Sequence, residues 1–316
     1  MSFVFTPIFN TKDLEQFMEF VLKTPDVALI EALPQRSDAW LIARKLRLTA
    51  SNFGAAVGIS AFCSPEDLLL QLLFGGFTGN EATRYGTENE PVACAQYLRD
   101  LTATFGSNAP THEESGLTVS TQWPWLGASP DGIMHCNVAA LHSNSIPVRN
   151  QPPGRDCALM GLESTTFSET DGPMTVSAVS WPNQAHRFLL EIKCPFRKRL
   201  YSSIPDYYFA QIQGSMQILD LPYCHFYVWT PHGSSLECFP RNDQYWNEFL
   251  FPRLRLFYFN RFLPLAFLQQ RGLLFGCNKP AGFKHTGLSL MPQGCSPQYV
   301  QFVYDFFSIK ILIEVV

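Results

Sequence analysis

The sequence lacks the patterns that mark several large protein classes. The nine cysteines are odd in number and scattered, and none forms a CxxC pair, so neither a zinc ribbon nor a disulfide framework is indicated. Reduced thiols in an intracellular compartment are expected. The N-terminus has no basic region followed by an apolar core, so no secretory signal is expected. No apolar run can span a bilayer, because charges interrupt even residues 300–316, which we interpret as a buried helix or strand. A small-molecule hydrolase has no support, because GxSxG, HExxH and a glycine-rich loop ending in GK[ST] are all absent.

Strong net charge is also absent. The formal charge is −4 over 316 residues, of which 46% are hydrophobic, as expected for a folded globular protein. A nucleic-acid-binding protein of this composition must concentrate its positive charge locally. Two local clusters qualify, although each could instead be an ordinary solvated face: Arg44, Lys45 and Arg47, and then Lys193, Arg197, Lys198 and Arg199.

Helical patterns dominate the first hundred residues, and short strands follow. Helices are predicted over residues 11–23, after Ser37 or Asp38, from Ser64-Pro65 to Gly75-Gly76, from near Thr87, and on the face shared by Phe209, Ile212, Met216 and Leu219. Strands are predicted at 117–119, 126–128, 189–193 and 225–230. We expect one domain, 1–316, with an insertion at about 137–186 and an unassigned region from about 232. Its aromatic stretch, 245–275, favours core packing over base stacking.

The residues that carry chemistry are Asp131 and the Glu191-Ile192-Lys193 segment. On a strand, residues i and i+2 point the same way, so Glu191 and Lys193 would face one site while the Ile192 side chain packs into the core. Carboxylates and a backbone carbonyl are natural ligands of Mg²⁺. Lys193 could orient the attacking water or contact the scissile phosphate. This donor set suits phosphodiester hydrolysis.

Each of these motifs is weak alone. Ser129-Pro130-Asp131-Gly132 also fits a plain type I turn, and an ExK strand is often only a salt-bridged surface pair. The informative feature is their order: Asp131 after one strand, ExK in the next, then a helix that carries Gln211.

Five blocks in this order resemble lambda exonuclease and the YqaJ-type viral recombinase nucleases of the PD-(D/E)xK superfamily, with the herpesvirus alkaline nucleases as more distant relatives. The blocks are Trp40–Arg44 with Leu48–Ser51, Tyr85–Ala93, Ala128–Gly132, Leu190–Phe196, and Tyr208–Gln213 with Met216. The resemblance implies an α/β fold, a restriction-endonuclease-like core in which helices flank a small mixed sheet with the active site at its edge.

The resemblance also implies roles for single residues. Asp131 and Glu191 resemble the metal-binding carboxylates, helped by the Ile192 backbone carbonyl, and Lys193 resembles the catalytic lysine. Glu90 resembles an additional metal-binding acid donated by a helix, although with Thr87 it could also form a capping box.

Gln211 resembles a glutamine that positions the attacking water. Because Gln211 and Gln213 flank the apolar stripe of their helix on opposite sides, at most one should face the site, and the motif favours Gln211. Arg44 and Ser51 resemble a pocket for a terminal 5′ phosphate. Their alternatives are an exposed helix charge and a helix N-cap.

The function implied is a Mg²⁺-dependent DNA exonuclease, with Mn²⁺ as a substitute metal, that resects duplex ends 5′ to 3′ for recombination. A single-strand annealing protein or recombinase, and other copies of the chain, are candidate partners in the cytoplasm or nucleus. The alternatives are an endonuclease or mixed DNA/RNA nuclease, and a non-catalytic nucleic-acid-binding scaffold. One departure from the family is that sixty residues separate Asp131 from Glu191, where the family motifs lie close together.

Overall fold

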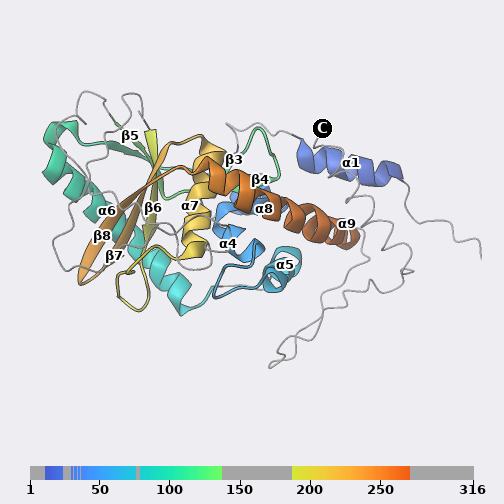
Figure 1. The fold of residues 1–316 in the computed structure, drawn as a ribbon, viewed down its shortest axis with the longest axis horizontal. Helices are drawn as coiled ribbons and strands as arrows, with labels where there is room; N and C mark the ends of the chain where they lie inside the picture. Colours follow the sequence, from blue (N-terminus) through green and yellow to red (C-terminus); the bar gives the residue numbers. More distant parts are fainter. Residues whose placement is uncertain are drawn as a thin grey trace, which may run out of the picture.

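The computed structural model describes residues 11–23, 30, 32–33, 35, 37–75, 79–136 and 187–270. The predicted insertion at 137–186 and the predicted apolar element at 300–316 lie outside these ranges. The sheet strands gather at one end of the molecule, and the C-terminal helices run toward the other (Figure 1). Among the described residues, no helix is both long and apolar enough to cross a membrane.

A five-stranded mixed sheet forms the centre of the fold, in the order β2-β5-β6-β7-β8. Its middle strand, β6, is antiparallel to β5 and parallel to β7, and the two outer strands are antiparallel to their neighbours. The strands are β2 (Thr111–Glu113), β5 (Gly132–His135), β6 (Arg187–Lys193), β7 (Tyr223–Thr230) and β8 (Gly233–Pro240). The predicted mixed sheet is therefore confirmed.

Helices α6 (Glu81–Phe105) and α7 (Asp206–Leu219) cover opposite faces of this sheet. Successive strand residues point to opposite faces. Leu190 and Ile192 of β6 accordingly pack with residues of α6, whereas Leu189 packs with residues of α7. The other odd-numbered residues of β6, which include the two charged ones of the ExK motif, therefore face α7.

A second, three-stranded sheet lies on the other side of α7, in the order β1-β4-β3. It consists of β1 (Leu48–Thr49), β3 (Thr118–Val119) and β4 (Leu126–Ala128). The remaining elements before residue 110 are α1 (Thr11–Leu22), α3 (Asp38–Arg44), η1 (Ala50–Asn52), α4 (Phe53–Ala56), α5 (Pro65–Phe74) and η2 (Gly106–Asn108).

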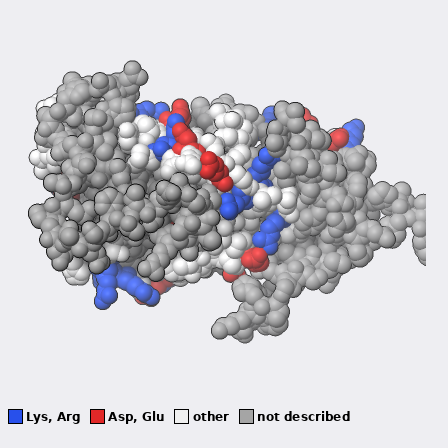
Figure 2. Space-filling model, viewed as in Figure 1, with Lys and Arg blue, Asp and Glu red and all other residues white. Residues whose placement is uncertain are grey.

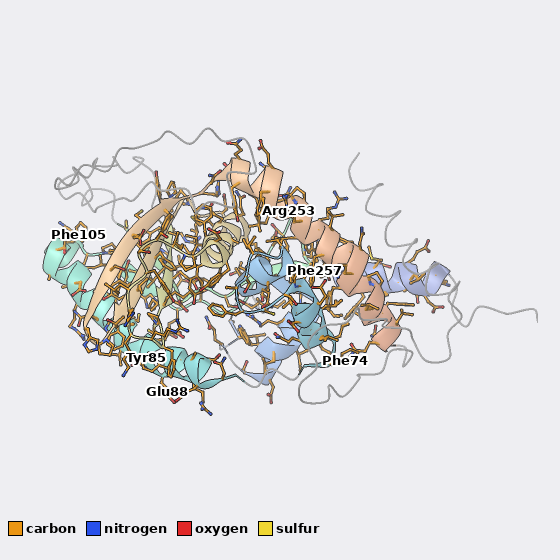
Figure 3. All side chains as sticks on the ribbon, turned by 60° about the horizontal axis from the view of Figure 1, so that its bottom comes forward. Phe74, Tyr85, Glu88, Phe105, Arg253 and Phe257 are labelled. Carbon is orange, nitrogen blue, oxygen red and sulfur yellow. The ribbon has the colours of Figure 1, made fainter. Side chains whose placement is uncertain are left out.

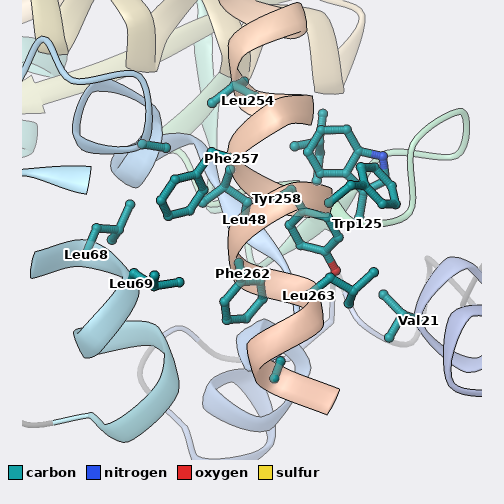
Figure 4. Packing of buried hydrophobic residues seen from close by; sticks show 14 of the residues in the cluster. Val21, Leu48, Leu68, Leu69, Trp125, Leu254, Phe257, Tyr258, Phe262 and Leu263 are labelled. Carbon is teal, nitrogen blue, oxygen red and sulfur yellow. The ribbon is translucent and has the colours of Figure 1, made fainter. Parts of the chain in front are cut away.

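The C-terminal region completes the core. After β8, one continuous helical rod follows, formed by η5 (Tyr245–Leu250), α8 (Phe251–Phe257), η6 (Tyr258–Phe262) and α9 (Leu263–Gln270). Its buried rings and aliphatic side chains pack against Leu48, Leu68 and Trp125 (Figure 4). The expectation of core packing is therefore confirmed for 245–270, whereas residues 271–275 lie outside the described ranges.

Several helix boundaries follow the predicted capping chemistry. The Ser37 side chain accepts a hydrogen bond from the N–H of Trp40, and Ser64 accepts one from Asp67 with Pro65 at the first helical position. The predicted start of a helix near Thr87 was wrong. Helix α6 begins at Glu81, where Asn80 caps it by accepting from the N–H of Thr83.

Candidate active site

Asp131 and Glu191 lie opposite each other on neighbouring strands. Strand β5 begins at Gly132, which pairs with Leu190, so one residue earlier the antiparallel register places Asp131 against Glu191. The His112 ring covers Gly132: a Cβ added there would lie 2.1 Å from His112 Nε2, so a larger residue would displace this ring. His112 Nε2 also lies 3.1 Å from the Asp131 carbonyl oxygen. The turn that carries Asp131 is therefore held firmly against the sheet.

Hydrogen bonds involve five predicted site residues, in two groups that meet at the end of β6. The backbone N–H of Ile192 donates to Asp131 Oδ2 at 2.6 Å. Glu191 Oε1 accepts from Lys193 Nζ and, at 2.5 Å, from Gln211 Nε2. Gln213 points elsewhere, donating to the Pro240 carbonyl at 3.0 Å. The prediction that at most one of the two glutamines faces the site, and that it is Gln211, agrees with this geometry.

Lys193 is a charged group in this environment. Burial alone would lower the pKa of Lys193, but the charges of Glu191 and Asp131 outweigh it and raise the pKa above the ordinary 10.5. The Lys193 Nζ also lies 4.8 Å from the centre of the Tyr208 ring, a cation–π contact. Lys193 is therefore an ammonium donor at neutral pH.

The two carboxylates repel each other. Burial raises the pKa of Asp131 well above its ordinary 3.8, and Glu191 and Glu90 raise it further, whereas Lys193 and the Ile192 N–H oppose the shift. Glu191 is only 2% exposed, and its Oε2 has no hydrogen-bond partner among the described residues. A divalent cation would satisfy that oxygen and relieve the repulsion, so the residues present fit a metal with oxygen ligands.

Glu90 approaches the site from the other face of the sheet. It lies on α6, whereas Glu191 and Lys193 face α7. With Asp131, Ile192 and His112 it lines a cleft of about 820 Å³. Within the described residues, no three His, Cys, Asp or Glu side chains are grouped closely enough to hold a metal. Glu90 therefore influences Asp131 electrostatically across the cleft.

The capping-box alternative for Glu90 was wrong. Thr87 and Glu90 lie in the second and third turns of α6, far from its cap at Asn80. Tyr85 and Glu88 mark the same part of the helix in Figure 3. Glu90 therefore does not cap the start of α6.

Arg44 is joined to the turn that carries Asp131. Its Nη1 donates to Ser129 Oγ at 3.2 Å and its Nη2 to Thr49 Oγ1 at 3.0 Å. Its guanidinium carbon lies 4.1 Å from the Trp40 ring centre, and burial lowers the pKa of Arg44 to about 10. The alternative of an exposed helix charge was therefore wrong.

Ser51 lies beside this arginine network. Its Oγ is 3.4 Å from Thr49 Oγ1, and the residue is exposed. The N-cap alternative was wrong, because Ser51 lies inside η1 and the residue at the N-cap position is Thr49. Arg44, Thr49, Ser51 and Ser129 therefore form one cluster of hydrogen-bond donors two residues from Asp131.

Sequence reasoning did not single out Thr49, Ser129 or Tyr208 as site residues. All three stood within the blocks that carried the family resemblance, which was the available signal. The expected position at the edge of the sheet also needs correction: β6 is the central strand, and the site lies at its C-terminal end, where pairing with β5 stops.

The predicted basic clusters differ in burial. Arg47 is half-buried and donates from Nε to the Pro124 carbonyl at 3.1 Å, so the first cluster is not a solvated face. Arg197, Lys198 and Arg199 are exposed in the segment between β6 and α7. On the face seen in Figure 2, described charges of both signs form small separate groups.

Comparison with known proteins supplies the family. The model of the YqaJ-like viral recombinase domain matches residues 39–221. No curated protein matches the chain. Among solved structures, the chain is similar to an alkaline exonuclease, LHK-Exo, from Laribacter hongkongensis, with 18% identity, a TM-score of 0.48, and coverage of 75% of this chain and 97% of that one. LHK-Exo in complex with dAMP gives 19% identity, a TM-score of 0.44, and coverage of 74% and 92%.

The family model spans the Arg44 cluster, α6, the Asp131 turn, the ExK strand and α7, which are the elements that build the site. The sequence-based assignment to the YqaJ-type viral recombinase nucleases is thereby confirmed, and the chain belongs to the YqaJ-like viral recombinase domain family.

Proposed function

We propose that this protein is a Mg²⁺-dependent DNA exonuclease that degrades one strand of a duplex end from 5′ to 3′. The observation that carries the proposal is the gathering at the end of β6 of Glu191, bonded to Lys193 and Gln211, and of Asp131, bonded to the Ile192 N–H. A non-catalytic scaffold would not need two mutually repelling carboxylates, Glu191 buried and Asp131 half-buried. Their electrostatic cost is explained by a cation that joins them during function.

The residues divide the chemistry among themselves. Asp131, Glu191 and the Ile192 carbonyl would hold Mg²⁺, or Mn²⁺ in its place, with Glu90 acting on the cation from across the cleft. The bound metal supplies Lewis-acid activation of water and of the phosphate. Lys193, an ammonium at neutral pH, donates to the negative charge that develops on the phosphate oxygens. Gln211 holds the Glu191 carboxylate and can orient the attacking water.

The Arg44 cluster is proposed to bind the terminal 5′ phosphate. Arginine is suited to this role because its planar guanidinium can donate two hydrogen bonds to one phosphate. Ser51 and Ser129 present hydroxyls beside it. Since Ser129 is two residues from Asp131, a phosphate held here lies close to the bond that is cut, which favours cutting from an end.

The product would be single-stranded DNA with a 3′ end. The partner proposed is therefore a single-strand annealing protein or recombinase that receives this strand inside the cell. Other copies of the chain are also candidate partners, because an assembly that encircles DNA would keep the enzyme on its substrate.

Digestion of linear duplex DNA with either a 5′ phosphate or a 5′ hydroxyl tests the end-binding role. We expect phosphorylated ends to be degraded faster by the wild type. Arg44→Gln should remove most of this preference, about 10- to 100-fold, because a charge-assisted contact contributes roughly 1.5–3 kcal/mol. Lys45→Gln is the matched control, since Lys45 is exposed on the same segment and should leave the preference intact.

Two results would contradict the proposal. Equal cutting of closed circular DNA or of RNA would instead indicate an endonuclease or mixed nuclease. Labelled duplexes that release nucleotides first from the 3′ end would reverse the proposed direction.

A further inference from the structure

Phe62 is a large apolar residue that the fold leaves exposed. It lies between α4 and α5 and is 82% exposed. Its ring meets the Tyr207 ring edge to face, with the centroids 5.6 Å apart. Burying the Phe62 side chain would be favourable, yet it stays exposed while Tyr207 holds its ring in place. Such an exposed apolar residue indicates a surface that binds a ligand.

A line of aromatic contacts leads from Phe62 to the catalytic lysine. The Tyr207 and Tyr208 rings lie 4.4 Å apart between centroids. Lys193 Nζ lies 4.8 Å from the centre of the Tyr208 ring. Phe62 is thus separated from Lys193 by only two tyrosine rings, both at the start of α7.

The segment that carries Phe62 is fixed to α7. The N–H groups of Ile59 and Ser60 both donate to the Gly54 carbonyl, at 2.9 and 3.1 Å. Gly54 in turn packs directly on Tyr207, since an added Cβ would lie 2.5 Å from the Tyr207 Cβ. Phe62 and Tyr207 are therefore held in place before any ligand arrives, which lowers the entropy lost on binding.

We propose that Phe62 and Tyr207 form a stacking platform for an unpaired base of the DNA strand that is being cut. The proposal rests on the proposed nuclease function. Single-stranded nucleic acids bind where exposed aromatic rings stand beside positive charge. Lys193, beside the Tyr208 ring, supplies positive charge at the inner end of this line of rings. The exposed Arg197, Lys198 and Arg199 add positive charge in the segment between β6 and the helix that carries Tyr207. Stacking would hold the base while its phosphate lies at Lys193.

An abasic scan of a 5′-phosphorylated oligonucleotide tests the platform. Abasic sites are placed at each of the nucleotides near the 5′ end, and binding is measured by fluorescence anisotropy in Ca²⁺. We expect one position at which base removal weakens wild-type binding by at least about fivefold, the lower end for one stacked base. Phe62→Ala should bind the intact strand correspondingly more weakly and be insensitive at that position. Phe62→Trp should restore the wild-type pattern, because another aromatic face can stack.

Phe20→Ala is the matched control, because Phe20 is also exposed, at 67%, but lies on α1, remote from the sheet (Figure 1). The platform would be overturned if Phe62→Ala showed the same dependence on abasic position as the wild type. It would also be overturned if Phe62→Ala lost the same affinity for the intact strand as for every abasic strand. If the expected pattern appears but the wild type cuts no DNA in Mg²⁺, the platform stands and the nuclease proposal fails. A wild type that binds no DNA would overturn both.

Discussion

The site is arranged for a ligand rather than for the stability of the chain alone. Glu191 Oε1 accepts two hydrogen bonds, while Oε2 is buried without a partner among the described residues. Asp131 lies against this carboxylate, which helps raise the pKa of Asp131. Because the folded-state pKa is raised, the metal-free protein loses stability as pH rises and Asp131 ionises. A cation bound between Asp131 and Glu191 would offset this loss of stability.

Asp131→Asn tests how the charge of Asp131 affects the stability of the protein with and without metal. At pH 8 in EDTA, we expect the variant to be more stable than the wild type, because the amide keeps an acceptor for the Ile192 N–H but carries no charge. In Mg²⁺ at 10 to 100 times its dissociation constant, the wild type should gain about 1.4–2.7 kcal/mol and the variant almost nothing. Thermal melts with and without Mg²⁺ measure both effects.

Glu88→Gln is the control, since Glu88 is exposed on α6 and should leave the gain from Mg²⁺ unchanged. Equal stabilisation of wild type and Asp131→Asn by Mg²⁺ would place the metal elsewhere.

At this scale the sequence predicted which residues would gather but not how they are linked. Strand alternation was enough to place Glu191 and Lys193 on one face. Helix geometry predicted that at most one of Gln211 and Gln213 faces the site, and the family motif was needed to choose Gln211. The hydrogen bonds from Arg44 to Thr49 and Ser129 bridge residues up to 85 positions apart. No local pattern encodes such contacts. The position of Glu90 across the sheet likewise depends on how α6 packs.

At the scale of elements, close packing between helices places α7. Gly54 of α4 contacts Tyr207, and Gly214 of α7 contacts the Phe53 ring, where an added Cβ would lie 2.3 Å from a ring carbon. Both glycines let the two helices approach closely. Because α7 carries Gln211 and Tyr208, this packing also sets the geometry of the site.

Gly54→Ala should therefore destabilise the fold. The new methyl group would lie 2.5 Å from Tyr207 Cβ and 2.7 Å from its Cα, so a helix must shift, at a cost of about 1–3 kcal/mol. Gly86→Ala on α6 is the matched control, because nothing lies within 4 Å of its added Cβ. It should be neutral or stabilise by about 0.5–1 kcal/mol, as alanine favours helix. Urea unfolding of both variants measures the difference, and equal stabilities would refute the packing argument.

A buried polar contact joins α6 to the sheet. The Tyr97 hydroxyl lies 2.7 Å from His225 Nδ1, and burial lowers the pKa of His225 from 6.5 to about 3. Folding therefore excludes a proton that the unfolded chain binds below pH 6.5. The contribution is fully present above pH 6.5 and is lost as pH falls toward 3.

Stability measured between pH 6.5 and 4 tests this contact. His225 should contribute a slope of up to about 1.4 kcal/mol per pH unit, with the protein less stable in acid. His225→Phe should flatten the slope, whatever its effect on stability at neutral pH. His232→Phe, at an exposed position after β7, should keep the wild-type slope. An unchanged slope in His225→Phe would assign the acid sensitivity to other groups.

Local chemistry predicted the helices better than the strands. The caps at Ser37 and Ser64 were readable because side-chain capping is local. Helix α6 was placed too late because it contains Gly86 and Pro91, which ordinarily interrupt helices. Strands β1, β2, β5 and β8 were missed. β5 follows directly on the turn at Asp131, and half of β8 is polar, so neither shows clear alternation.

At the scale of the whole molecule, residues 233–270 belong to the same core as the candidate site. Strand β8 extends the central sheet, and Tyr258 donates to the Leu46 carbonyl at 2.6 Å. Arg253 and Phe257 lie along the same rod, and the Arg253 guanidinium lies 4.1 Å from the Phe249 ring centre (Figure 3). The hydrogen bond between Tyr258 and Leu46, 212 positions apart, depends on global folding, which is why the sequence left the region unassigned.

The measurement that tests the account most directly is digestion of linear duplex DNA in Mg²⁺ by the wild type and Glu191→Gln. Glutamine keeps the size of the side chain but removes the charge that would hold the cation. We predict progressive degradation by the wild type and a loss of at least about 1000-fold in Glu191→Gln, with Glu88→Gln as active as the wild type. Undiminished cutting by folded Glu191→Gln would contradict the assignment of the site.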